Sequence, residues 1–239
     1  TLRRKGSVIM KTLRKIYCRT FQTGLKIALP FLPYRTPKVA GSVKALPKII
    51  QKKNCRKVLI ITDEGIRKLG LTLRLEKALT DAKIPYCIYD KTVANPTTDN
   101  VAEAVRLYRK AGCDCIIGFG GGSSMDCAKA VGACIVKPKQ SLKKMKGILK
   151  VHKKLPLLMA VPTTAGTGSE TTLAAVITDG QTRHKYAIND FPLIPRYAVL
   201  DPGVTLGLPP FITATTGMDA LTHAVEAYIG NSTTYGTQK

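Results

Sequence analysis

From residue 57 onward, short apolar runs alternate with amphipathic segments of helical length, and this alternation constrains the fold more than any other feature. The runs KVLIIT at 57–62 and DCIIGF at 114–119 are short and rich in β-branched residues, which is typical of buried strands. Strands separated by helices form parallel sheets, because each helical crossover returns the chain to the same edge. We therefore expect an α/β fold with a parallel sheet covered on both faces.

The alternation predicts individual elements along the chain. Strands are expected at 57–62, 84–89, 114–119, 157–161, 173–178 and 197–200. Helices are expected at 71–82, 98–111, 126–136 and 212–229. Gly112 directly follows the second of these helices, at a position where glycine commonly ends a helix.

Positive charge is concentrated in two segments. The net charge is +23, and residues 1–57 hold 16 basic and no acidic residues, while residues 137–154 hold 8 basic and no acidic residues. The rest of the chain is therefore close to neutral. With 6% aromatic residues and no Trp, the chain has little surface on which bases could stack, so we expect no nucleic-acid partner.

The N-terminal basic segment contains a predicted amphipathic helix over 8–32, ended by Pro30 and Pro33. Its apolar positions, at helical spacing, are Leu13, Ile16, Tyr17, Phe21, Leu25, Ala28 and Leu29. Such a helix is typical of an anchor on an anionic membrane surface, here through residues 1–33. A leader helix that packs on its own domain or on a partner is an equally good interpretation, and the composition is also compatible with an organelle transit peptide.

Two further features narrow the cellular context. No stretch of about 18 uncharged apolar residues occurs, so we expect no membrane-spanning helix. The seven cysteines form no CxxC pair, and their odd number indicates a reducing compartment. We expect a cytoplasmic protein, with any membrane association arising from the N-terminal segment.

A glycine-rich turn follows the strand predicted at 114–119. It reads GGGSS over 120–124 and leads into a helix. Glycines let the backbone approach a phosphate closely, and the helix N-terminus adds free N–H groups, so the turn predicts a pyrophosphate site. Asp63 ends the first strand, where a carboxylate either binds the ribose of NAD or caps the next helix. Its charge would repel the 2′-phosphate of NADP.

A second loop and a helical pair also indicate chemistry. The sequence VPTTAGTGSE at 161–170 offers a row of hydroxyl groups for a phosphate or a nicotinamide amide. Asp219 and His223 are spaced i and i+4 on a predicted helix, so both project from one face. A carboxylate and an imidazole suit Fe²⁺ or Zn²⁺, but two ligands do not complete a site, and such a pair is commonly a surface hydrogen bond.

Three motifs together resemble the iron-containing (group III) alcohol dehydrogenases. They are GGGSSMDCAK at 120–129, PTTAGTGSE at 162–170 and GMDALTHAVEAY at 217–228, and the resemblance extends over roughly residues 38–239. It implies an NAD-binding α/β domain, here 38–210, and an all-helical metal and substrate domain, of which 211–239 is the start. Residues 1–37 form a basic extension outside the family core.

The resemblance also implies roles for individual residues. The implied cofactor-binding residues are Asp63, Asn95, Gly121, Gly122, Ser123, Asp126, Thr163, Thr164, Thr167 and Lys185. Asp219 and His223 are the implied first two metal ligands; the family's other two are histidines on later helices that this sequence does not contain. Ser124 departs from the family, which usually has Pro there. No residue is an evident general base.

The implied function is a metal-dependent oxidoreductase that transfers a hydride between NAD(H), with NADP less favoured, and a small alcohol or aldehyde. We expect the chain to be an N-terminal fragment that is inactive alone, and the full-length protein to be a homo-oligomer. The alternatives are a glycerol-dehydrogenase-like or dehydroquinate-synthase-like enzyme of the same fold, or a non-catalytic basic module that binds membranes or nucleic acid.

Overall fold

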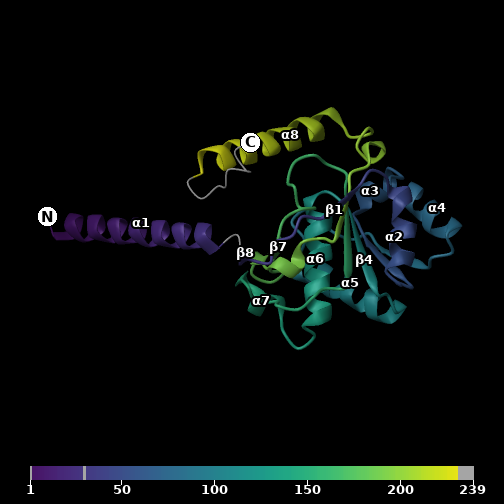
Figure 1. Cartoon of the computed structure of the whole chain (residues 1–239), viewed down its shortest axis with the longest axis horizontal. Coiled ribbons are helices and arrows are strands. Elements are labelled where there is room, and N and C mark those ends of the chain that lie inside the picture. Colours follow the sequence, from purple (N-terminus) through teal and green to yellow (C-terminus); the bar gives the residue numbers. More distant parts are fainter. Residues whose placement is uncertain (1, 29–30, 231–239) are drawn as a thin grey trace. The chain divides into compact units, whose positions relative to one another are not determined.

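The structure is a computed structural model that describes residues 2–28 and 31–230. The chain divides into two units. One unit comprises Arg35–Gly217 and contains all the strands labelled in Figure 1. The other comprises the chain up to Tyr34 together with the chain from Met218.

Six strands of the Arg35–Gly217 unit form one parallel sheet in the order β1-β9-β6-β4-β2-β3. The strands are β1 Lys38–Ala40, β2 Val58–Ile61, β3 Tyr86–Tyr89, β4 Cys115–Gly120, β6 Leu157–Pro162 and β9 Tyr197–Val199. Val58 of β2 lies opposite Tyr86 of β3 and Cys115 of β4, which places β2 between them. The predicted parallel sheet is confirmed, and β4 at its centre is buried along its whole length.

The described part of the chain contains α-helices of very different length. They are α1 Leu2–Ala28, α2 Leu46–Lys52, α3 Glu64–Lys68, α4 Leu73–Asp81, α5 Thr98–Ala111, α6 Gly122–Val136, α7 Leu142–Met145 and α8 Pro210–Ile229. Short 3-10 helices cover Val43–Ala45, Phe191–Leu193 and Pro202–Val204.

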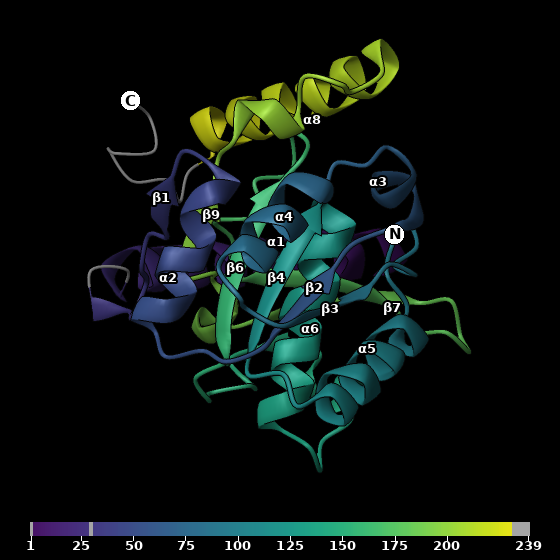
Figure 2. The ribbon, with the colours of Figure 1, turned by 90° about the vertical axis from the view of Figure 1, so that its right-hand side faces the viewer.

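Neighbouring residues of β4 pack into different hydrophobic cores. Ile116 belongs to a core with Val101 of α5 and Val131 of α6. Ile117 belongs to a second core with Leu75 and Leu79 of α4. Because side chains alternate along a strand, these cores lie on opposite faces of the sheet, so helices cover both faces as predicted (Figure 2).

Helix ends agree with the sequence where capping residues set them. The α5 helix spans Thr98–Ala111 as predicted, because Thr97 forms a capping box with Asn100 and Gly112 ends the helix in the left-handed conformation, with φ of 66°. The α6 helix begins at Gly122 instead of residue 126. Its first turn is rich in Gly and Ser, which have modest helix propensity, and burial of Ser124 and Met125 holds it instead.

The strand predicted at 173–178 does not join the parallel sheet. It forms β7 (Ala174–Thr178), which pairs antiparallel with an unpredicted strand, β8 (Lys185–Asn189). β5 (Gly147–Ile148) completes this second sheet in the order β5-β8-β7. The chain between β7 and β8 is too short for a parallel crossover, and Asp179 holds it as a turn by accepting hydrogen bonds from the N–H groups of Gln181 and Thr182.

The predicted N-terminal helix is present as α1. None of its described side chains is buried, and its apolar residues Leu13, Ile16, Tyr17 and Phe21 are all exposed. The predicted apolar position Leu29 and Pro30 lie outside the described residues. Among the helices that the structure describes, none is long and apolar enough to cross a membrane.

Candidate cofactor site

Loops that follow β2, β4 and β6 meet at the carboxyl edge of the parallel sheet and border a groove of about 540 Å³. Residues lining it include Asp63, Glu64, Gly65, Ile66, Leu69, Thr92, Val93, Ala94, Gly121, Gly122, Ser123, Ser124, Thr163 and Thr164. In open parallel sheets this edge is the usual ligand position, because strand ends and helix N-termini converge there.

Glycines shape the turn between β4 and α6. Gly120 has φ of 145°, and a Cβ there would lie 2.6 Å from Ser124 Oγ, so only glycine fits. A Cβ on Gly122 would lie 2.9 Å from Thr167 Cγ2, so a side chain there would press on the second loop. Gly121 is the N-cap of α6 in an extended conformation and, having no side chain, forms no side-chain capping hydrogen bond. The turn therefore leaves the N–H groups at the start of α6 open to an anion.

Asp63 has two partners. Its Oδ1 accepts a hydrogen bond from the N–H of Ile66 at 2.9 Å, so Asp63 is the N-cap of α3. Its Oδ2 accepts from Ser124 Oγ at 3.2 Å, which links it to the glycine turn. The capping interpretation is confirmed, and because Asp63 also lines the groove, ribose binding stays a prediction alongside it.

Asn95 lies next to the glycine turn, and its role towards a cofactor stays a prediction. Its N–H donates to Ser123 Oγ at 3.2 Å. Its φ is 58°, in the left-handed region that Asn tolerates better than most residues. Asn95 thereby fixes Ser123 from the loop that follows β3.

The threonines of the second loop differ in their surroundings. Thr163 is buried, its N–H donates to the carbonyl of Gly120 at 3.0 Å, and its hydroxyl has no hydrogen-bond partner among the described residues. A buried hydroxyl without a hydrogen-bond partner is costly, so Thr163 carries a polar group that a ligand in the groove could satisfy. Thr164 lines the groove, and the hydroxyl of Thr167 accepts from the N–H of Ser169 at 3.3 Å.

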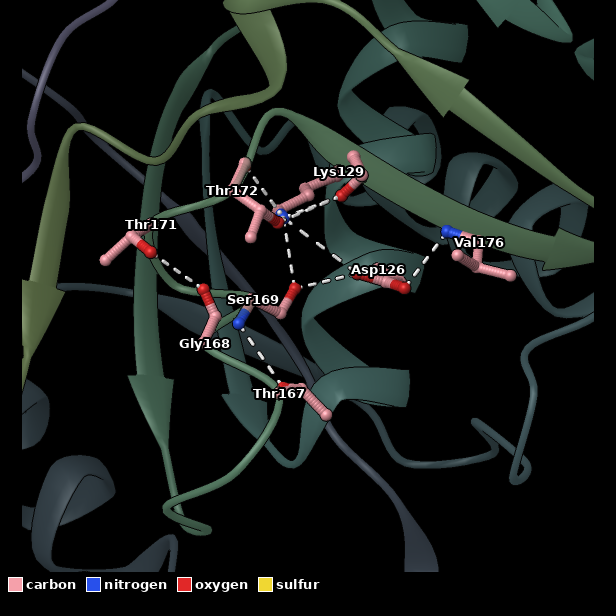
Figure 3. Close-up of polar contacts among 9 residues, drawn as sticks. Asp126, Lys129, Thr167, Gly168, Ser169, Thr171, Thr172 and Val176 are labelled. Atoms are coloured by element: carbon pink, nitrogen blue, oxygen red, sulfur yellow. Dashed lines mark hydrogen bonds and ion pairs between the residues drawn. The ribbon is translucent and has the colours of Figure 1, made fainter. Parts of the chain in front are cut away.

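A buried lysine that sequence reasoning missed holds this second loop to α6. Lys129 is fully buried. Its Nζ donates to Ser169 Oγ at 3.0 Å and to the Ala174 carbonyl at 2.8 Å (Figure 3). It also donates to the carbonyl of Thr172 at 3.0 Å and to the hydroxyl of Thr172 at 2.9 Å. Its position in an otherwise apolar helical stretch, CAKAVGAC, was the signal in the sequence.

Asp126 completes this network from the preceding turn of α6. It accepts from Ser169 Oγ at 2.7 Å and from the N–H of Val176 at 3.0 Å, and it lies 3.9 Å from Lys129 Nζ (Figure 3). Burial raises the pKa of Asp126, although Lys129 and both hydrogen bonds oppose that shift. Burial lowers the pKa of Lys129 to about 8, against the charges of Asp126 and Glu170.

Four of the predicted cofactor residues are not among those that line the groove: Asn95, Asp126, Thr167 and Lys185. The carboxylate of Asp126 is directed to the network just described, and Asp126 is not among the lining residues. Lys185 is the exposed first residue of β8 and does not line the groove either. Their roles towards a cofactor stay predictions.

The predicted metal ligands do face each other on α8. His223 Nε2 lies 3.8 Å from Asp219 Oδ1, one helical turn away, and both side chains are about half exposed. Within the described part of the chain, no further His, Cys, Asp or Glu joins them in a group of three potential ligands. The donor types suit a divalent transition metal, and the role of the pair as metal ligands stays a prediction.

Known proteins similar to this chain form one consistent group. The profile of a family described as iron-containing alcohol dehydrogenase matches residues 36–202. Alcohol dehydrogenase 4 of Schizosaccharomyces pombe is 38% identical over 225 residues, covering 90% of this chain and 53% of the yeast protein. The NAD-dependent methanol dehydrogenase of Bacillus methanolicus is 35% identical over 204 residues, covering 85% of this chain and 53% of that enzyme.

Solved structures agree with these matches. A 1,3-propanediol oxidoreductase has a TM-score of 0.81 at 35% identity, covering 85% of this chain and 54% of that one. Sulfoacetaldehyde reductase from Bifidobacterium kashiwanohense, solved in complex with NAD⁺, has a TM-score of 0.72 at 28% identity, covering 82% of this chain and 52% of that one. The chain thus spans about half the length of the relatives it matches.

Proposed function

Because this chain belongs to the iron-containing alcohol dehydrogenase family, we propose that it forms the NAD-binding part of a metal-dependent oxidoreductase acting on a small alcohol or aldehyde. The groove at the carboxyl edge carries this proposal, since Asp63, the turn at 120–124 and Thr163 all border it. The two alternatives, a glycerol-dehydrogenase-like or dehydroquinate-synthase-like enzyme and a basic binding module, are not favoured by the relatives found.

We assign the following roles to the groove. The N–H groups of Gly122 and Ser123 at the start of α6 bind the pyrophosphate, with Gly121 leaving space for it. Asp63 accepts the ribose hydroxyls and disfavours a 2′-phosphate, which selects NAD over NADP. The hydroxyls of Thr163 and Thr164 face the nicotinamide side, and the Thr163 hydroxyl gains the partner it lacks.

The reaction needs two groups that the protein must hold. Asp219 and His223 would supply a carboxylate oxygen and an imidazole nitrogen to a divalent metal. The family to which the chain belongs indicates that this metal is iron. When bound, that metal supplies Lewis acidity towards the substrate oxygen, and NAD(H) carries the hydride. The chain's own contribution is to orient the cofactor through the glycine turn and through the second loop, which Lys129 and Asp126 hold to α6.

A fluorescence titration tests the cofactor half of this proposal. NADH added to the purified chain should bind saturably, NADPH should bind more weakly, and ADP-ribose should displace NADH. A folded chain that binds neither dinucleotide contradicts the proposal. Alcohol-dependent NAD reduction by the native full-length protein, loaded anaerobically with Fe²⁺ or Zn²⁺, tests the oxidoreductase half.

A further inference from the structure

Cysteine side chains gather at the edge of the parallel sheet opposite the cofactor groove. Cys55 precedes β2, Cys87 lies near the start of β3, and Cys113 and Cys115 lie at the start of β4. All of them are free thiols, and the structure places them in two neighbouring pairs, Cys87 with Cys113 and Cys55 with Cys115. Neither pair belongs to the groove or to the network around Lys129.

The Cys87 and Cys113 sulfurs are in direct contact. Their Sγ atoms lie 3.3 Å apart, although the residues are 26 positions apart in sequence. A disulfide needs a separation of about 2.05 Å, so the sulfurs have to approach by only about 1.2 Å. Cys87 is held by its register with Leu59 of β2, and the N–H of Cys113 donates to the carbonyl of Tyr108 at 3.0 Å. The fold therefore fixes both backbones with the thiols already together.

The two thiols differ in exposure and acidity. Cys87 is partly exposed, whereas Cys113 is 7% exposed. The hydrogen bond from Cys113 lowers the pKa of Cys87 to about 7, with help from the Lys57 charge and against the effect of burial. Donating that bond, together with burial, raises the pKa of Cys113. Cys87 is thus the accessible nucleophile, and Cys113 is a protonated thiol beside it.

In the second pair, Cys55 and Cys115, the surroundings raise the pKa of both thiols. The sulfurs of Cys55 and Cys115 and the carboxylate of Asp114 lie within 4.8 Å of one another. Burial and the Asp114 charge raise the pKa of Cys55, and burial raises that of Cys115. Neither thiol is easily ionised, so this pair is an internal control at the same edge of the sheet.

We propose that Cys87 and Cys113 are a redox modification site that hydroperoxides convert to a reversible disulfide. The Cys87 sulfur attacks the terminal peroxide oxygen, the O–O bond breaks, and Cys87 becomes a sulfenic acid while the alkoxide leaves, or hydroxide in the case of hydrogen peroxide. The Cys113 sulfur then attacks the sulfenic sulfur, the S–O bond breaks, and the hydroxyl group leaves with the Cys113 proton as water. The protein loses two electrons and two thiol hydrogens, and a dithiol reductant restores them.

Peptide mass spectrometry of the full chain tests this proposal. The folded protein is treated with hydrogen peroxide at pH 7, its remaining thiols are alkylated, and it is digested without reduction. We expect a peptide pair cross-linked through Cys87 and Cys113 that disappears on reduction with dithiothreitol. From the thiolate fraction and the weaker nucleophilicity of a more acidic thiol, Cys87 should oxidise roughly threefold faster than an ordinary thiol.

Variants separate the two steps. Cys113→Ser should leave a sulfenic acid on Cys87 that dimedone labels, whereas Cys87→Ser should give neither the cross-link nor dimedone labelling of Cys113. Cys55→Ser, the matched control, should leave the Cys87–Cys113 cross-link unchanged. The proposal is overturned if wild-type protein gives no such cross-link while folded, or gives it no faster than a Cys55–Cys115 cross-link.

Discussion

Gly121→Asp should strongly weaken NADH binding while leaving the fold intact. Gly121 is the N-cap of α6, with φ of −76° and ψ of −172°, an extended conformation that any residue can adopt. A Cβ there would lie 3.7 Å from Thr164 Oγ1, an ordinary contact. Because Asp is among the best N-cap residues, the substitution should stabilise α6 by about 0.3 kcal/mol.

The effect on the cofactor should be much larger and of opposite sign. The new carboxylate would stand where the proposed pyrophosphate binds. Two like charges about 5 Å apart at an effective dielectric constant of about 20 repel by about 3 kcal/mol. This corresponds to a loss of roughly 150-fold in NADH affinity at low salt, with a smaller loss at high salt because ions screen the repulsion.

Gly121→Asn is the matched control, since Asn has nearly the same shape and also caps helices but carries no charge. NADH fluorescence titration should give a much smaller loss of affinity for the Asn variant than for the Asp variant, and thermal unfolding should show both variants folded. Equal losses for Asp and Asn would mean that bulk, not charge, matters there. Unchanged binding by the Asp variant would refute a pyrophosphate at the start of α6.

Four other predictions concern Asp63, Lys129 and the N-terminal segment. Asp63→Asn keeps the α3 cap but removes the charge, so the NADPH-to-NADH affinity ratio should rise roughly tenfold; an unchanged ratio in parallel titrations would separate Asp63 from cofactor selection. Lys129→Met leaves Asp126 and Ser169 without their buried partner and should lower the free energy of unfolding in urea by about 3–5 kcal/mol, whereas a loss below about 1 kcal/mol would contradict the network. The difference in the free energy of unfolding between wild type and Lys129→Met should increase from about pH 8 to pH 10, because native Lys129 releases its proton near pH 8 while unfolded lysine keeps it until about pH 10.4. A difference that decreases over this pH range would contradict the lowered pKa of Lys129. Deleting residues 1–33 should reduce sedimentation with anionic liposomes, since each cation near such a surface contributes about 1 kcal/mol to the free energy of binding. Equal sedimentation of the intact and truncated chains would contradict a membrane-binding role for α1.

Features encoded by neighbouring residues were predictable from the sequence. The α5 helix has both predicted ends because Thr97, Asn100 and Gly112 act within one turn of the residues they cap. The glycine turn was predictable for the same reason, since the steric demand at Gly120 arises from Ser124, four residues away. The alternation of strands and helices likewise predicts a parallel sheet, although it does not specify the order of the strands.

Features that join distant segments were decided only by the tertiary structure. The hairpin of β7 and β8 and the strand order depend on which surfaces each segment can bury, and short apolar runs do not encode a partner. In the candidate site, the structure brings Asn95 to Ser123 and directs Asp126 to Ser169, away from the groove. Lys129 and Ser169 are 40 positions apart and Cys87 and Cys113 are 26 apart, so neither contact exists until the sheet has assembled. Residue type and local spacing therefore determined which chemical groups the chain carries, while packing determined which of them meet, because a buried polar group is tolerated only where the fold supplies its partner.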